Sequence, residues 1–138
     1  MQFISTRGGM SPIGFTDVLL QGLGPDGGLT VPAETPRLTA EDLESLRPLP
    51  YAELAARIIG LYATDIPAAD LREMTAAAYG PPHFPAEAVP LHRLDAVADG
   101  LVLVDLSEGP TLAFKDLAMQ FLGQAIPVAR SQARQVRC

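Results

Sequence analysis

An apolar run that breaks sharply into a helical pattern is the feature of this sequence that most constrains its fold. Residues 101–106 read Leu-Val-Leu-Val-Asp-Leu and follow Gly100, as expected of a short strand that is covered on both faces. Residues 107–110, Ser-Glu-Gly-Pro, interrupt this run. From Phe114 onward, apolar residues recur at steps of three and four, which is the pattern of an amphipathic helix. The segment therefore predicts a strand, a tight turn and a helix, in that order.

The two ends of this helix also carry signals. Thr111 is a candidate N-cap, and Asp116 suits the first turn because its charge complements the positive end of the helix dipole. Pro127 is expected to interrupt the helix, since proline removes a backbone donor and clashes with the preceding turn. We therefore expect the helix to run from about Phe114 to a point before Pro127.

Lys115 is the only lysine in the chain, and it falls at the start of the predicted helix. At about 100° per residue it lies within roughly 20° of Leu122, on the apolar side, so its amine is predicted to point toward the interior or a cleft. Desolvation and the helix N-terminus both disfavour the ammonium form, so we predict a lowered pKa and an amine that can attack a carbonyl. The alternative is a lysine that extends from the helix edge into solvent.

A phosphate-binding loop is excluded at this position. The GxxxxGK[ST] pattern would need glycine at position 114 and serine or threonine at position 116. The chain has Phe114 and Asp116 instead. Nucleotide phosphate binding by this segment is therefore not expected.

Two separated segments share a resemblance to one enzyme family. The first reads FISTRGG at residues 3–9 and continues as GFTDVLLQGLGPDGGLTVP at residues 14–32. The second reads EGPTLAFKD at residues 108–116 and continues as LAMQFLG. In this order they resemble threonine synthase, a pyridoxal-phosphate enzyme, over roughly residues 1–123. The family commonly has histidine where this chain has Glu108, which weakens any role for that position.

The resemblance implies a definite fold and reaction. The fold would be α/β, with a helix-rich N-terminal lobe followed by the first strand–helix unit of a fold type II pyridoxal-phosphate domain. The reaction would convert O-phospho-L-homoserine and water to L-threonine and phosphate. Lys115 would anchor pyridoxal 5'-phosphate and also move protons, making it both the catalytic and the cofactor-binding residue. Thr111 and Asp116 would mainly shape the helix start.

The resemblance also suggests how the chain is divided. Residues 1–95 would form the threonine synthase-like N-terminal domain, and residues 96–123 the start of the cofactor domain. Residues 124–138 would be a tail outside the family pattern, with Arg130, Arg134 and Arg137 and no acidic residue. The tail could be a basic segment for an anionic partner, a terminus without fixed structure, or out-of-frame translation after a truncating event, and we favour the last.

Between the two motifs, three helices are expected. Residues 39–46 begin with a threonine cap followed by early acidic residues. Residues 51–62 place Leu54, Ile58 and Leu61 on one face, and residues 67–79 show a similar stripe. These helices are most simply packing elements, and the alternative is that their apolar edges form a protein interface.

Composition limits the remaining classes of function. The net charge of −6 argues against nucleic acid or anionic membrane as a main partner. The only cysteine, Cys138, permits no internal disulfide, which favours a cytoplasmic location. His83 and His92 lack cysteine neighbours, so no metal site is expected. The expected partner is a small-molecule substrate, and the oligomeric state stays open.

Parts of a pyridoxal-phosphate site are missing after Lys115. The only later glycine is Gly123, so no glycine-rich turn for the cofactor phosphate follows, and no partner for the pyridine nitrogen is evident. A buried strand at residues 101–106 would also lack neighbours. We therefore expect the 138-residue chain to be a fragment that is poorly stable, prone to aggregate and inactive by itself.

Two other functions stay open on sequence grounds. One is a related pyridoxal-phosphate lyase, such as a threonine or serine dehydratase, although the STRG and DGGL opening favours threonine synthase. The other is a non-catalytic binding protein that has kept the lobe and lost the chemistry.

Overall fold

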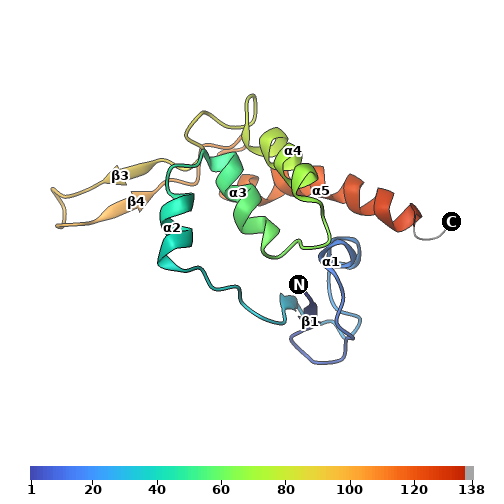
Figure 1. The fold of residues 1–138 in the computed structure, drawn as a ribbon. Helices are drawn as coiled ribbons and strands as arrows, with labels where there is room; N and C mark the ends of the chain where they lie inside the picture. The colour runs from blue at the N-terminus through green and yellow to red at the C-terminus, as the bar shows by residue number, and fades with distance from the viewer. Residues whose placement is uncertain (136–138) are drawn as a thin grey trace.

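A computed structural model describes residues 1–135 of the chain, so Arg137 and Cys138 lie outside the described residues. Along the sequence, α1 lies between β1 and β2, the helices α2, α3 and α4 follow one another, and the strands β3 and β4 precede α5 (Figure 1). The helices are α1 (Phe15–Gln21), α2 (Ala40–Leu46), α3 (Tyr51–Gly60), α4 (Ala68–Tyr79) and α5 (Asp116–Gln135). The strands are β1 (Phe3–Ser5), β2 (Thr30–Pro32), β3 (Leu91–Arg93) and β4 (Val102–Val104).

The hydrophobic core lies where α4 meets α3 on one side and α5 on the other (Figure 1). Helix α1 packs against α5, and side chains from the loops before and after α4 complete the cluster. Burial of these apolar side chains is the main force that holds the helices together. The buried members are Ala63, Ile66, Leu71, Met74, Ala78, Tyr79, Phe84, Ala88, Phe121 and Ala125.

Tyr79 connects the core to the start of α5. Its ring packs edge-on against Tyr51, with 5.0 Å between ring centroids, and its hydroxyl donates a hydrogen bond to the Leu117 carbonyl over 2.9 Å. Burial raises the pKa of Tyr79 to about 12, and the Tyr51 hydroxyl adds to the effect. The phenol therefore stays protonated and keeps its donor, so α4 holds the first turn of α5 in place.

The predicted helix at residues 39–46 is confirmed, together with its cap. The Thr39 hydroxyl accepts a hydrogen bond from the Asp42 backbone N–H over 3.1 Å, and the Asp42 carboxylate accepts one from the Thr39 backbone N–H over 2.8 Å. This reciprocal pair is a capping box that satisfies two backbone donors at the helix start. The hydrogen bond from the Thr39 backbone lowers the pKa of Asp42.

The stripe of Leu54, Ile58 and Leu61 does not face the main core. These side chains are half-buried and line grooves against α2 and the residues around Leu38, whereas the adjacent side of α3 packs against the core with Ala55 and Ile59. Helix α3 is therefore apolar on two sides. It forms a bridge between α2 and the α4–α5 pair.

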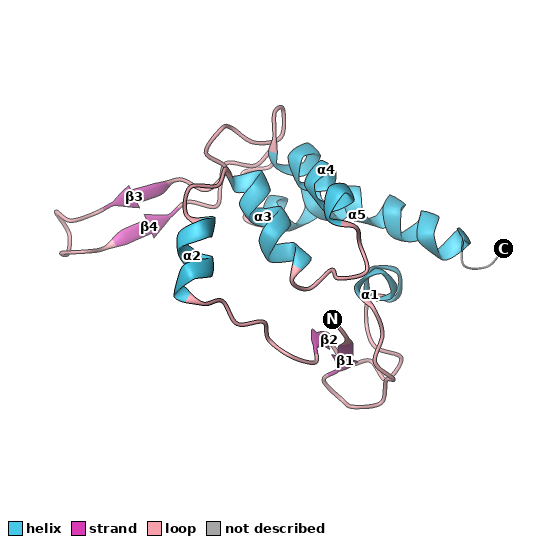
Figure 2. Cartoon of the chain, viewed as in Figure 1, coloured by secondary structure: helices cyan, strands magenta, loops and turns pink. Residues whose placement is uncertain are grey.

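The strands form two separate antiparallel pairs. Strand β1 pairs with β2, with Phe3 opposite Pro32, and β3 pairs with β4, with Leu91 opposite Val104. Figure 2 shows the β3–β4 hairpin extending away from the helices. Every residue of β3 and β4 is exposed. The expectation of a strand covered on both faces is therefore wrong for this chain, because no further strand or helix of residues 1–135 packs against it.

Helix α5 differs from its predicted course at both ends. It begins at Asp116 rather than near Phe114, and it continues through Pro127 as far as Gln135. Proline costs one backbone hydrogen bond, but the helix is buried on both sides of it through Phe121, Ala125 and Ala129. Packing of this face thus outweighs the local penalty, and the expected interruption at Pro127 is wrong. No helix within residues 1–135 has the length and apolar character needed to cross a membrane.

Candidate functional site

Lys115 is the last residue before α5. Its backbone carbonyl accepts hydrogen bonds from the Ala118 and Met119 N–H groups, over 3.1 Å and 2.9 Å, so it occupies the N-cap position of the helix. Its side chain is exposed. The prediction that the amine points toward the interior is therefore wrong for this chain, because it required residue 115 to lie inside the helix, whereas α5 begins at Asp116. The alternative that the amine points into a cleft stays a prediction. The role of Lys115 as a site residue also stays a prediction.

The loop before Lys115 is closed by a buried carboxylate. Asp116 is 5% exposed and accepts two hydrogen bonds from Thr111, one from the backbone N–H and one from the hydroxyl, each over 2.8 Å. Burial alone raises the pKa of Asp116, but the hydrogen bonds from Thr111 and Ala113 outweigh it and hold the pKa below its ordinary value. We call this contact the Thr111–Asp116 pair, and it fixes the path of the chain into α5.

Thr111 therefore has a different role from the one predicted. Its hydroxyl donates a hydrogen bond to the Asp116 carboxylate across the loop. Thr111 is therefore not the N-cap of α5, which begins at Asp116. Asp116 does lie in the first turn of the helix, as predicted. Its carboxylate serves the loop as well as the helix dipole.

Two backbone features give the loop its shape. Gly109 is buried against Asp116, and a Cβ added at position 109 would lie 2.3 Å from the Asp116 Cβ. The Leu112 N–H donates to the Gly109 carbonyl over 3.0 Å, and Leu112 has a φ of 58°, in the left-handed region that non-glycine residues seldom adopt. The loop at residues 109–115 is thus a tightly determined turn, so the position at which Lys115 emerges is determined as well.

The surface beside Lys115 is apolar. Leu112 is 75% exposed, Phe114 is 64% exposed and Met119 is 56% exposed. Large apolar side chains that remain in solvent next to an amine mark a surface suited to contact with a ring system or another polypeptide. Among residues 1–135, no three histidine, cysteine, aspartate or glutamate side chains gather in a way that could hold a metal ion.

The N-terminal motif is organised by Asp26, to which the sequence alone assigned no role of its own. One oxygen of its carboxylate accepts from the Ser5 hydroxyl over 2.7 Å and from the Gly28 N–H over 2.9 Å, and the other accepts from the Gly9 N–H over 2.8 Å. A Cβ at Gly28 would lie 2.2 Å from the Ser5 hydroxyl oxygen. The STRGG and DGG segments are therefore one structure built around a carboxylate.

Asp26 makes the stability of this turn dependent on pH. Hydrogen bonds, first from Ser5 and then from Gly28, lower its pKa from the ordinary 3.8. A carboxyl group whose pKa is lower in the folded state than in the unfolded state stabilises the fold at pH values above its unfolded-state pKa. This stabilisation is lost as the pH falls through its folded-state pKa. We expect Asp26→Asn to be less stable than the wild type at pH 7 and to lose less of its melting temperature between pH 6 and pH 2.5.

Thermal unfolding followed by circular dichroism at several pH values measures this difference. Asp99→Asn, which removes the same charge from an exposed loop, is the control and should follow the wild type. Parallel pH curves for Asp26→Asn and the wild type would contradict the assigned role.

A second long-range carboxylate contact was also missed. Asp65, in the connection between α3 and α4, accepts hydrogen bonds from the Thr16 N–H over 2.9 Å and from the Thr16 hydroxyl over 2.8 Å. It therefore caps the start of α1 from 49 residues away. A cap supplied from so far along the chain leaves no signal in the residues next to the helix. The only local sign is that Gly14, at the start of α1, has no side chain that could cap the helix.

Comparison with known proteins assigns the family. A family model described as "Threonine synthase N terminus" matches residues 2–79, which is more than half of the chain. The chain belongs to the threonine synthase family. It is 47% identical over 130 residues to threonine synthase from Corynebacterium glutamicum, covering 90% of this chain and 26% of that protein. It is 41% identical over 140 residues to threonine synthase from Methylobacillus glycogenes, covering 96% of this chain and 29% of that protein.

Solved structures show the same fold. The chain resembles the pyridoxal-phosphate-bound threonine synthase from Brucella melitensis with a TM-score of 0.88 and 41% identity, covering 96% of this chain and 28% of that chain. It resembles the Escherichia coli threonine synthase with a TM-score of 0.81 and 27% identity, covering 94% of this chain and 28% of that chain. The predicted family and α/β fold class are confirmed. The chain spans between 26% and 29% of the length of these relatives.

Proposed function

We propose that the chain is the lysine-bearing N-terminal portion of a threonine synthase, which converts O-phospho-L-homoserine and water to L-threonine and phosphate. Membership of the family supports this reaction, and the relatives described above are named threonine synthases. The observation that carries the proposal is Lys115, the only lysine, at the end of a loop that the Thr111–Asp116 pair closes.

The cofactor we propose is pyridoxal 5'-phosphate, which is bound in the similar Brucella melitensis structure. Its covalent attachment needs an accessible primary amine on a well-positioned backbone, and the exposed Lys115 at the N-cap of α5 fits that need. When bound, the cofactor would withdraw electrons from the substrate carbons. Lys115 would hold its aldehyde and, once released, hold and deliver protons at those carbons.

The remaining parts of the proposal concern the chain in isolation. We propose that the 138-residue polypeptide tends to aggregate, because the β3–β4 hairpin and the side chains near Lys115 expose apolar surface. We also propose that it does not turn over substrate by itself. The division at residues 95 and 123 stays a prediction. A cytoplasmic location is supported by the single cysteine in the sequence.

Reduction with borohydride tests the role of Lys115. The chain carries two primary amines, the Met1 amino group and Lys115, so mass spectrometry of peptides can compare them directly after treatment with pyridoxal phosphate. We expect the folded chain to carry the pyridoxyl group mainly on Lys115, and this preference to disappear in urea. Lys115→Arg is the control and should be modified only at Met1.

The same measurement separates the alternatives. A folded chain modified only at the Met1 amino group, with Lys115 left unchanged, would contradict the proposal and favour a non-catalytic binding protein. Turnover of O-phospho-L-homoserine by the isolated polypeptide would instead contradict the proposed inactivity. The resemblance to named threonine synthases favours that reaction over a dehydratase.

A further inference from the structure

A groove lies between α3 and α4, on the part of the lobe that carries neither motif. Its volume is about 340 Å³, which is within the range of small-molecule sites. Most of the side chains that line it are small or aliphatic, and two arginines, one from each helix, complete the lining. The lining residues are Ala56, Arg57, Gly60, Ala63, Thr64, Ile66, Ala68, Leu71 and Arg72.

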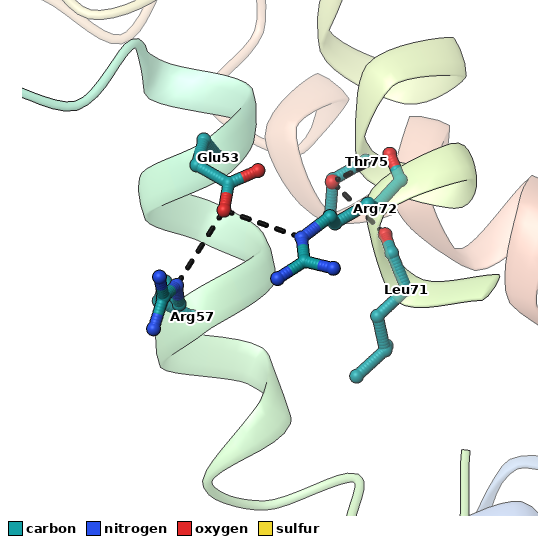
Figure 3. A network of polar contacts seen from close by, with 5 residues as sticks. All are labelled: Glu53, Arg57, Leu71, Arg72 and Thr75. Atoms are coloured by element: carbon teal, nitrogen blue, oxygen red, sulfur yellow. Dashed lines mark hydrogen bonds and ion pairs between the residues drawn. The ribbon is translucent and has the colours of Figure 1, made fainter. Parts of the chain in front are cut away.

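The two arginines are held together by one carboxylate oxygen. Arg57 Nε and Arg72 Nε lie 3.4 Å and 3.3 Å from the same Oε1 atom of Glu53 (Figure 3). These distances are longer than the 2.7–2.9 Å typical of charge-assisted hydrogen bonds, so Glu53 holds the guanidinium groups loosely. Within residues 1–135, the terminal nitrogens of both groups make no hydrogen bond or ion pair. They can therefore donate to a ligand.

The local charge favours an anion. Two guanidinium groups share one carboxylate, which leaves an excess positive charge on a chain whose net charge is −6. The Met1 ammonium group donates a hydrogen bond to the Thr64 hydroxyl, so a third cation lies near the groove. A planar carboxylate matches the fork of donors that a guanidinium group presents.

The apolar lining selects the rest of the ligand. Ala56, Ile66 and Leu71 line the groove with 3–6% of their surface exposed, Ala63 is fully buried, and Ala68 adds an exposed methyl group to the lining. Such walls stabilise a short hydrocarbon group and offer few partners to a fully polar anion such as inorganic phosphate. An anion with a small branched aliphatic body satisfies both the arginines and the walls.

We propose that the α3–α4 groove binds a small carboxylate that carries a short branched aliphatic group. Arg57 and Arg72 bind the carboxylate, the alanine, leucine and isoleucine side chains contact the aliphatic group, and Glu53 orients the two guanidinium groups. This site does not depend on Lys115 or on the proposed reaction. Either proposal can fail without the other.

Titration followed by ¹⁵N nuclear magnetic resonance of the 138-residue chain tests the site, with 3-methylbutanoate as the probe. We expect saturable shifts of the Arg57 and Arg72 Nε–H signals and of the Ala63 amide. Loss of one charged contact at an exposed site should weaken binding about fivefold in Arg72→Gln. Glu53→Gln keeps an oxygen that can orient the arginines but removes the competing charge, so it should tighten binding about threefold.

Matched variants and probes distinguish this site from general attraction to charge. Arg93→Gln and Glu44→Gln remove the same charges from the hairpin and from α2, and both should bind like the wild type. If Arg72→Gln does not fold by circular dichroism, Arg57→Gln replaces it. Equal shifts with the uncharged 3-methylbutanamide, equal affinity for inorganic phosphate, or equal weakening in Arg93→Gln would each overturn the proposal.

Discussion

Replacing Phe121 with alanine is expected to lower the free energy of unfolding by about 3–5 kcal/mol, the usual cost of removing a buried aromatic ring. Phe121 is 9% exposed and lies in the core between α4 and α5. Domains of this size are stabilised by only about 5–15 kcal/mol, so the variant should be largely unfolded at modest urea concentrations. Urea unfolding followed by far-ultraviolet circular dichroism measures the change.

Met119→Ala is the matched control for this prediction. Met119 lies on the same helix but is 56% exposed, so its removal should change the free energy of unfolding by less than about 0.5 kcal/mol. If both substitutions destabilise the chain equally, or if neither destabilises it, the described packing of α5 against α4 is contradicted.

The second large effect is expected from Gly109→Ala. The added Cβ would lie 2.3 Å from the Asp116 Cβ, which is fixed by α5 and cannot rotate away. Overpacking of this kind costs about 1–3 kcal/mol of stability. To make room for the added methyl group, the loop must move away from α5, which separates Thr111 from Asp116. We therefore expect faster hydrogen exchange of the Thr111 amide and a weaker preference of pyridoxal phosphate for Lys115 over the Met1 amino group.

Gly123→Ala is the matched control, and it is expected to raise the stability of the chain rather than lower it. A Cβ added at position 123 has no atom within 4 Å beyond its chain neighbours and the nearby backbone of its own helix, and alanine is favoured over glycine in a helix by about 0.5–1 kcal/mol. This variant should be slightly more stable than the wild type and should keep the wild-type exchange rate at Thr111. An unchanged Thr111 amide in Gly109→Ala would contradict the role of the Thr111–Asp116 pair.

Helices with strong local patterns were predicted well. The capped helix after Thr39 and the helix that ends at Tyr79 occur where the sequence places them. Their signals are a cap, a regular apolar stripe and a flanking proline, which act within a few residues. The family resemblance likewise depended on short continuous motifs, and comparison with known proteins confirmed it.

The site was predicted less completely. Lys115 was singled out because it is the only lysine, and its role stays a prediction, but its expected direction followed from a helix start that the structure moves by about two residues. Helix boundaries are among the least reliable features of a sequence, and a shift of this size turns a side chain to another face. The carboxylates of Asp26 and Asp65 were missed because their partners lie far along the chain.

Local order in this protein could thus be inferred from residues that are neighbours in the chain. The tertiary structure alone decided which contacts were made across distance. Packing on both sides of Pro127 kept α5 continuous, and the absence of a neighbour among residues 1–135 left β4 exposed despite its apolar sequence. The reason is that burial and long-range hydrogen bonding depend on where other segments lie, and their free energies exceed the local preferences of a few residues.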